Sequence, residues 1–393
     1  MTATERRASV WLSSIFALRM LGLFLVLPVF VLEAARYPGG QDPALVGLTM
    51  GLFGLTQALL QIPFGMASDA WGRKRVIVVG LLVFAAGSFV AAAAQDIHGL
   101  MIGRALQGAG AMSAAVTALL ADLTRDEVRT KGLALLGGSI GLMFALSLVL
   151  APLLNTHIGL SGLFATTGLM ALAGIFITLR LVPAEPPQHK DLQGGRFWDV
   201  LRNRELLGLN FGVFALNAVQ LAMWVAVPAM LVQAGLDKSL HWHVYLPAVL
   251  ASFVVMGGTL FPMERRGHLR AVLLAAIALL ALVQLGFLEI AGAPTLWGLA
   301  TLILLFFCSF NILEASLPSL VSRLIPASSR GSALGVFNTA QSLGLFAGGA
   351  LGGLLLKSGG TGVLFGAMAG LSLLWLLLAW WLLPALKRKQ ASH

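Results

Sequence analysis

Long apolar runs, separated by short polar segments, repeat along the whole chain. A helix that crosses a bilayer needs about 20 mostly apolar residues, and each run reaches that length. The pattern therefore predicts an all-α polytopic membrane protein with twelve transmembrane helices. The expected ranges are 11–33, 44–67, 75–95, 98–121, 132–154, 160–181, 206–233, 242–263, 270–291, 295–320, 332–356 and 362–385.

One connection is longer than the others and divides the chain. It covers 182–205 and holds three prolines and two glycines, which interrupt helices. We expect 1–181 and 206–393 to form two pseudo-symmetric six-helix bundles joined by this cytoplasmic linker. The halves also look like repeats, because Leu27-Pro28-Val29 is matched 200 positions later by Val227-Pro228-Ala229.

The composition fits the same class. Of 393 residues, 58% are hydrophobic and only 11% are charged, whereas a soluble protein carries roughly a quarter charged residues. The lone cysteine, Cys308, excludes a disulfide framework and a cysteine-based metal cluster. The net charge of +10 would suit a nucleic-acid partner, but the basic residues lie at the ends of apolar runs, so we exclude that partner.

The placement of Lys and Arg predicts the orientation. If the amino terminus is cytoplasmic, 21 of the 26 lie on the cytoplasmic side, and only Arg36, Lys238 and Lys357 lie on the other. By the positive-inside rule, both termini are then cytoplasmic in a bacterial inner membrane. The run 11–33 is too long for the core of a cleaved signal peptide and contains Arg19, so we interpret it as a retained span.

Three motifs carry a family resemblance. The connection after the second span reads Gly65-Met-Ala-Ser-Asp69-Ala-Trp-Gly72-Arg73-Lys74-Arg75 and resembles the signature loop of the major facilitator superfamily, with Ala70 where Arg is usual. Arg104-Ala-Leu-Gln107-Gly108 resembles the motif of its proton-coupled members. Gly137-Gly138-x-x-Gly141, followed by Ala151-Pro152, is similar to its glycine-rich antiporter motif. The whole chain resembles the drug:proton antiporter type, and we expect no soluble domain after the last span.

The resemblance implies a conformational lock at the signature loop. It involves Gly65, Asp69, Gly72, Arg73, Lys74 and Asp122. Asp69 would face the amino end of the eleventh span near Gly331 and Ser332, and Arg73 would bridge toward Asp122. An anion at a helix amino end is stabilised by roughly 0.3–1 kcal/mol. The alternative is that the three cations of the loop only anchor it to anionic lipid.

The ionisable residues inside spans are candidates for proton coupling. The resemblance assigns Arg104 to this role, and the acid candidates are Glu314, Glu33 and Asp69, in that order. Charged side chains in a span are costly and usually pair or face a cavity. Arg19 and Glu314 lie at similar depths, so they either interact across the halves or each pairs within its own half.

Polar residues within the spans predict a substrate cavity. The candidates are Arg19, Gln57, Gln61, Gln107, Asn217, Gln220, Asn311, Glu314, Asn338 and Gln341. Hydrogen bonding between helices is the alternative role for any one of them. The glycines of the fifth and eleventh spans are expected to allow close helix packing. His241 and His243 are expected to be solvated loop residues.

The resulting expectation is a proton-coupled exporter of small amphipathic or drug-like compounds that works by alternating access. The alternative is an importer or facilitator of a small metabolite such as a sugar or amino acid. A membrane enzyme is disfavoured because no metalloprotease, nucleophile-elbow or phosphate-loop motif occurs. We expect no cofactor, the proton gradient as the energy source, and a monomer in the lipid bilayer.

Overall fold

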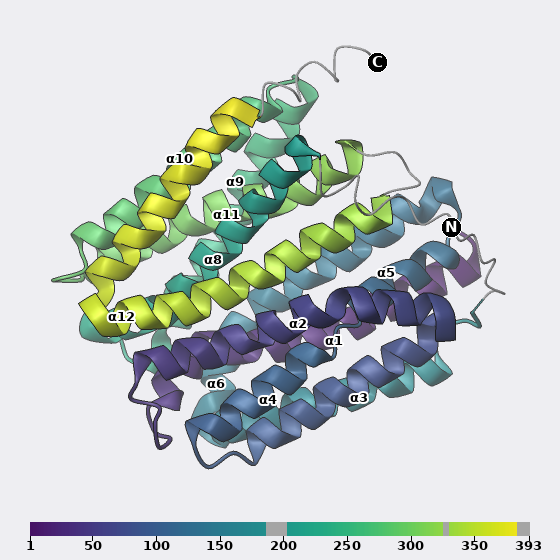
Figure 1. Ribbon diagram of the computed structural model, residues 1–393, viewed down its shortest axis with the longest axis horizontal. Helices are drawn as coiled ribbons and strands as arrows, with labels where there is room; N and C mark the ends of the chain where they lie inside the picture. The colour runs from purple at the N-terminus through teal and green to yellow at the C-terminus, as the bar shows by residue number, and fades with distance from the viewer. Residues whose placement is uncertain (186–202, 325–329, 383–393) are drawn as a thin grey trace. The chain divides into compact units, whose positions relative to one another are not determined.

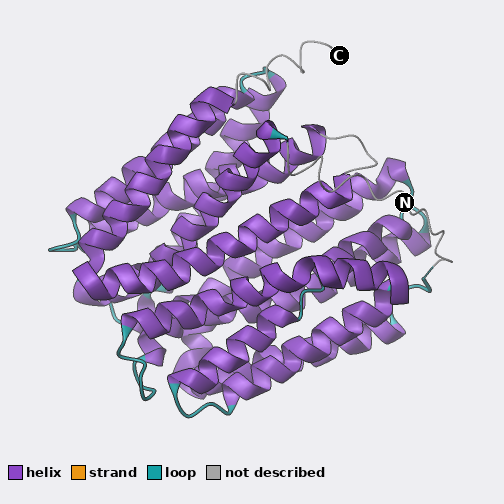
Figure 2. Cartoon of the chain, viewed as in Figure 1, coloured by secondary structure: helices purple, strands orange, loops and turns teal. Residues whose placement is uncertain are grey.

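The computed structural model describes residues 1–185, 203–324 and 330–382, apart from the side chains of residues 126, 127, 130 and 330–332. These residues form helices joined by short loops, and no strand occurs among them (Figure 2). Nine of the described helices are long and apolar enough to cross a membrane. Many large apolar side chains point outward, among them Trp297, Trp381 and Val254, which are 76–84% exposed. Such a surface suits lipid rather than water, so the chain is a multi-pass membrane protein.

The chain divides into two compact units, Met1–Lys190 and Asp191–His393. The predicted linker, 182–205, lies largely outside the described residues. The helices of the first unit are α1 (Ala3–Ala34), α2 (Pro43–Trp71), α3 (Arg73–Ala92), α4 (Ile97–Ala109), α5 (Ser113–Asp122) and α6 (Asp126–Arg180). Those of the second are α8 (Arg204–Gln233), η1 (Lys238–Leu240), α9 (Trp242–Arg265), α10 (Leu269–Glu289), α11 (Leu296–Leu324) and α12 (Arg330–Leu382).

Within the first unit, α1 packs along α6, and α3 contacts both α4 and α6; these helices are labelled in Figure 1. The cluster at its centre is apolar and buried. It includes Leu12, Phe16, Ile77, Phe84, Met112 and Leu119. In the second unit, α8 packs along α12, and α11 contacts α9 and α10.

Local sequence explains where several helices begin. Thr2 and Glu5 cap the start of α1 reciprocally, as a capping box, so this helix begins at Ala3 rather than at residue 11. The Asp42 side chain accepts the Ala44 N–H at the start of α2, and Asp96 accepts the Gly99 N–H at the start of α4. Each cap satisfies a backbone donor that has no partner inside the helix.

The fourth predicted span, 98–121, is not one continuous helix. It divides into α4 and α5, with residues 110–112 outside both. A Cβ on Gly110 would lie 2.4 Å from the Gly80 carbonyl oxygen, and one on Gly108 would lie 2.1 Å from the Phe53 carbonyl oxygen. Glycine is therefore needed at both places, because α4 passes very close to α2 at Gly108 and the break after α4 passes very close to α3 at Gly110.

Two glycines divide the longest helices. Gly159 interrupts α6 with φ 66° and ψ −176°, and Gly360 interrupts α12 with φ 71° and ψ −168°. These angles belong to a region that only glycine occupies readily. Each long helix therefore consists of two helical segments, which meet at Gly159 in α6 and at Gly359 and Gly360 in α12.

The glycines of α12 pack against α8. A Cβ on Gly344 would lie 2.3 Å from the Phe214 carbonyl oxygen, and one on Gly348 would lie 2.2 Å from the Ala218 carbonyl oxygen. The prediction of close packing is correct for this pair. Gly137 and Gly138 of α6 have no such neighbour in their own unit, because an added Cβ would meet no atom within 4 Å, so for them the prediction stays untested.

Candidate functional site

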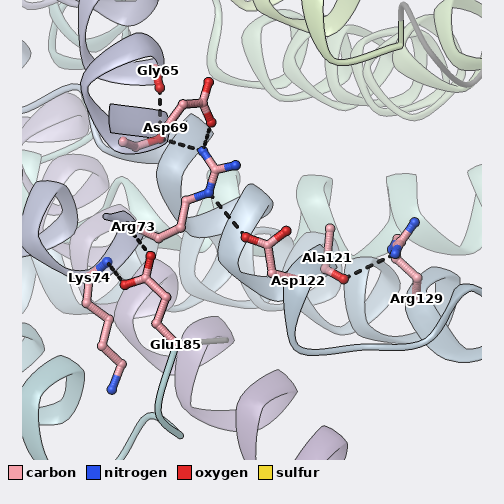
Figure 3. A network of polar contacts seen from close by, with 9 residues as sticks. Gly65, Asp69, Arg73, Lys74, Ala121, Asp122, Arg129 and Glu185 are labelled. Carbon is pink, nitrogen blue, oxygen red and sulfur yellow. Dashed lines mark hydrogen bonds and ion pairs between the residues drawn. The ribbon is translucent and has the colours of Figure 1, made fainter. Parts of the chain in front are cut away.

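The signature loop forms a polar network around Arg73, at the start of α3 (Figure 3). The Arg73 guanidinium donates to the Ser68 hydroxyl at 2.8 Å and to the Asp122 carboxylate at 3.2 Å. It also pairs with Asp69, one helical turn earlier in sequence. The Arg73 side chain is 17% exposed and that of Asp69 is 66% exposed, so the cation is more shielded than its partner. Arg73 thus links the end of α2 to the end of α5.

A second carboxylate, which the sequence analysis did not identify, completes this network. Glu185 accepts the backbone N–H of Arg73 at 2.6 Å and that of Lys74 at 3.3 Å. Because Gly72 precedes α3 and provides no side-chain cap, Glu185 satisfies two of the free donors at this helix end and meets its partial positive charge. The Lys74 ammonium donates to the Val182 carbonyl at 2.7 Å. The segment after α6 is therefore attached to the signature loop.

The other predicted lock residues lie at the edges of this network. The Gly65 carbonyl accepts the Ser68 hydroxyl at 2.8 Å, and Gly72 has a φ of 104° that favours glycine. The predicted contact of Asp69 with Gly331 and Ser332 concerns the other unit and side chains outside the described residues, so it stays a prediction.

Arg104 lies in a buried polar chain between α4 and α3. Its guanidinium donates to the Gln107 side-chain oxygen at 2.9 Å, and the Gln107 amide donates to the Ser88 hydroxyl at 2.8 Å. The guanidinium carbon of Arg104 also lies over the Phe53 ring, 5.0 Å from the ring centre. Arg104 is only 2% exposed, so this part of the motif holds a positive charge in apolar surroundings.

Arg19 is buried in the same unit, beside the break between α4 and α5. It donates to the Ser113 hydroxyl at 3.1 Å and to the Gly110 carbonyl at 3.4 Å. Its guanidinium lies 5.4 Å from the centre of the Phe84 ring. The described ion pairs of the first unit join Glu33–Arg36, Asp69–Arg73, Asp122–Arg73, Asp96–His98 and Glu5–Arg125. None of these pairs includes Arg19 or Arg104.

Glu33, a candidate for the coupling acid, is 2% exposed and pairs with Arg36 at 2.9 Å at the end of α1. Its partner is 66% exposed. None of the described ion pairs of the first unit is formed between Glu33 and Arg104.

Glu314, the first candidate for the coupling acid, lies in α11. One carboxylate oxygen accepts the Gln341 amide at 2.8 Å, and Asn217 of α8 lies beside it. The other oxygen is buried without a hydrogen-bond partner. Glu314 thus interacts with amides of its own unit, and its direct pairing with Arg19 stays a prediction.

The remaining cavity candidates have varied surroundings. The Asn311 amide donates to the Ser252 hydroxyl at 2.7 Å, which is the helix-to-helix role. Both polar atoms of Gln61 and the oxygen of Gln57 are buried and lack hydrogen-bond partners. Gln220 and Asn338 are partly exposed. Whether these residues line one cavity stays a prediction.

The expectation for His241 is wrong. It is 1% exposed and packs edge-on against Tyr245, with ring centres 6.0 Å apart. It lies between the helical turn η1 and the start of α9, and its burial was not indicated by the local polar sequence. Over the described part of the chain, no group of three or more His, Cys, Asp or Glu residues could hold a metal ion.

Comparisons with known proteins agree with this architecture. The chain is 42% identical over 385 residues to the inner membrane transport protein YajR of Escherichia coli, covering 96% of this chain and 84% of YajR. It is 27% identical to the multidrug resistance protein MdtH of Aeromonas salmonicida, covering 90% and 89% of the two chains.

Among solved structures, the peptide-transporter-family protein PepTSo superposes with a TM-score of 0.79 at 13% identity, over 98% of this chain and 99% of that one. At that identity the likeness concerns the fold alone. The sequence profile of the Major Facilitator Superfamily matches residues 12–349 and 263–393. From this match and the YajR identity it follows that the chain belongs to the Major Facilitator Superfamily.

Proposed function

We propose that this transporter exports small amphipathic or drug-like compounds in exchange for protons, by alternating access. In this proposal the two segments of α6, the two of α12 and the α4–α5 pair complete twelve spans in two six-helix bundles. The termini are cytoplasmic in a bacterial inner membrane. The resemblance to YajR and to multidrug resistance proteins supports this class of substrate.

The observation that carries proton coupling is the setting of Glu314. Its carboxyl group lies within an apolar helix, contacts the uncharged amide of Gln341 and has one buried oxygen without a hydrogen-bond partner. The described ion pair of this unit, Arg323–Glu264, does not include it. A carboxylate in such a site is costly unless it is neutralised. The group is therefore suited to take up a proton when water reaches it from one side and to release it to the other.

Proton uptake would change the conformational balance. An ionised Glu314 needs water or a cationic substrate, whereas the neutral acid tolerates a closed site. A proton or substrate shifts the equilibrium only by its differential affinity for the two states. The Arg73 network would hold Asp69 and the ends of α2 and α5 in place within the first unit, and the predicted contact of Asp69 with the start of α12 would then oppose opening on that side.

The test is a proton-flux assay in proteoliposomes with an acidic interior and an internal pH dye. Amphipathic cations, neutral drugs and sugars are added in turn to wild type, to Glu314→Gln, and to the matched control Glu289→Gln at the exposed end of α10. We expect that at least one of these compounds dissipates the proton gradient with wild type and with the control, but not with Glu314→Gln. The Gln variant should still exchange labelled compound across the membrane, because the amide resembles the protonated acid.

Other outcomes would contradict parts of the proposal. Proton flux that persists in Glu314→Gln would remove this residue from the coupling step. Transport of a sugar or amino acid without proton movement would instead favour the facilitator alternative.

A further inference from the structure

We propose that Arg19 and the amino-terminal end of α5 form a binding site for the carboxylate, or an equivalent anionic group, of a small solute. The inference rests on the proposed transport function, because it names the chemical class of a substrate. It starts from three features of the first unit: a buried guanidinium, a broken helix and a partly exposed hydroxyl between them.

Arg19 is a buried cation without an anionic partner in its own unit. It is 1% exposed, and none of the described ion pairs of the first unit includes it. An arginine within a span is costly and is usually paired or faces a water-filled cavity. Its residual charge is therefore available for an anion that reaches it.

The guanidinium also has unused donors. Arginine carries five N–H groups in a planar fork, and the described hydrogen bonds go only to Ser113 and Gly110. Nε is buried without a hydrogen-bond partner. A carboxylate can accept two parallel N–H bonds from such a fork, which neither a hydroxyl nor a backbone carbonyl can do.

The second component is the amino-terminal end of α5. This ten-residue helix begins at Ser113, directly after the break, and no side chain caps it. Its first backbone N–H groups and its dipole favour an anion there. The Arg19 guanidinium is hydrogen-bonded to the Ser113 hydroxyl, so the cation and the helix end meet at one point.

The position within the membrane identifies the source of the anion. Arg19 lies 8 residues after the start of the expected span 11–33, about 12 Å into it at 1.5 Å per residue. That depth lies well inside a hydrocarbon core of about 30 Å, away from the lipid headgroups. Ser113 is partly exposed, so a dissolved solute that contacts Ser113 is one hydrogen bond from the guanidinium.

Arg104 does not offer the same arrangement. It is equally buried and its Nε also lacks a hydrogen-bond partner, but its guanidinium bonds to the Gln107 amide oxygen at 2.9 Å and to the Met50 carbonyl at 3.5 Å, whereas that of Arg19 bonds to the first residue of a helix. The start of α5 thus distinguishes Arg19 from Arg104, and a carboxylate is the solute class that matches it.

The experiment is calorimetric titration of the purified, detergent-solubilised protein with 2-naphthoate. Its uncharged analogue 2-naphthamide and the cation tetraphenylphosphonium serve as comparison ligands. We expect wild type to bind naphthoate at least about 10-fold more tightly than naphthamide, since only the carboxylate gains charge-assisted bonds. Equal binding of the two, tighter binding of the cation, or no binding of naphthoate would each overturn the inference without any variant.

Variants then locate the site. Arg19→Gln should weaken naphthoate binding at least about 10-fold, and Arg19→Lys by less because it keeps the charge but not the fork. The matched control is Arg180→Gln, which removes the same charge from the exposed end of α6 and should leave affinity unchanged. If Arg19→Lys and Arg19→Gln, both monodisperse, bind like wild type, the site is elsewhere.

A change of lipid distinguishes a dissolved solute from a lipid headgroup as the source of the anion. Replacing neutral lipid by phosphatidylglycerol in nanodiscs should not change naphthoate affinity, and competition by that lipid would overturn the assignment to a dissolved solute. The titration measures binding without transport. It can therefore fail while proton-coupled export of another compound succeeds, and it can succeed while proton coupling fails.

Discussion

Replacing Gly348 by alanine should destabilise the second unit. The new Cβ would lie 2.2 Å from the Ala218 carbonyl oxygen of α8, whereas real Cβ contacts are essentially never under 3.0 Å. The opposing atom belongs to the backbone and cannot rotate away, so α8 and α12 must separate by about 0.8 Å along this face.

The magnitude follows from two opposing effects. Overpacking of a close contact costs about 1–3 kcal/mol, and a rigid backbone contact belongs at the upper end of that range. Alanine gains about 1 kcal/mol over glycine in a helix. The net loss should therefore be about 2 kcal/mol, which lowers the melting temperature by about 4–8 °C for a unit of this size.

Gly370 of α12 provides the matched control. An added Cβ there meets no atom within 4 Å, so Gly370→Ala should gain helix propensity without a clash and raise the melting temperature by about 2–4 °C. The two substitutions are chemically identical and should have opposite signs.

The lone cysteine gives the assay. Cys308 in α11 is 6% exposed and becomes reactive toward a fluorogenic maleimide when the second unit unfolds, so one thiol reports one transition. A Gly348→Ala protein that melts at or above the wild-type temperature would refute the close α8–α12 contact as its cause.

Substitutions at three further positions test the polar contacts. Glu185→Ala should speed amide hydrogen exchange at Arg73 by roughly 5-fold, because a lost helix cap costs about 1 kcal/mol. The exchange rate of Glu185→Gln should lie between those of wild type and Glu185→Ala, and a Glu185→Ala rate equal to that of wild type would contradict the cap. Arg73→Lys should reduce transport several-fold while preserving folding, since lysine lacks the fork that reaches three acceptors; full activity would show that charge alone suffices. The Ser239 hydroxyl and amide lower the pKa of Asp237. Ionised Asp237 therefore stabilises the fold fully at any pH above the ordinary aspartate pKa, and this stabilisation is lost as the pH falls through the lowered pKa. Ser239→Ala should raise the pKa of Asp237, measured by NMR titration of the carboxyl carbon, and an unchanged value would exclude the Ser239 hydroxyl as a cause.

The apolar pattern predicted the helices well because lipid imposes both length and composition. Most boundaries of the described helices lie within a few residues of the expected ones. The start of α1 differs because capping by Thr2 and Glu5 extends the helix through polar residues. The break between α4 and α5 was not visible in hydropathy, because residues 110–112 are as apolar as their neighbours.

The signature loop was predictable where charge and spacing sufficed. Arg73 does reach Asp122 as expected, and the role of this contact as a lock stays a prediction. Glu185 was missed because it lies over a hundred residues from the amides it accepts, in a proline-rich segment without a motif. The break beside Arg19 was missed for a similar reason, since packing of glycine against backbone depends on three-dimensional proximity.

Gly159 and Gly360 lie 201 positions apart and have nearly the same backbone angles. This spacing differs by one from that of the two prolines inside α1 and α8, Pro28 and Pro228. A shared turn at equivalent positions is what duplication of an ancestral half-length gene would leave behind. Because only glycine occupies these angles readily, selection should retain glycine codons at both places even after the surrounding sequences have diverged.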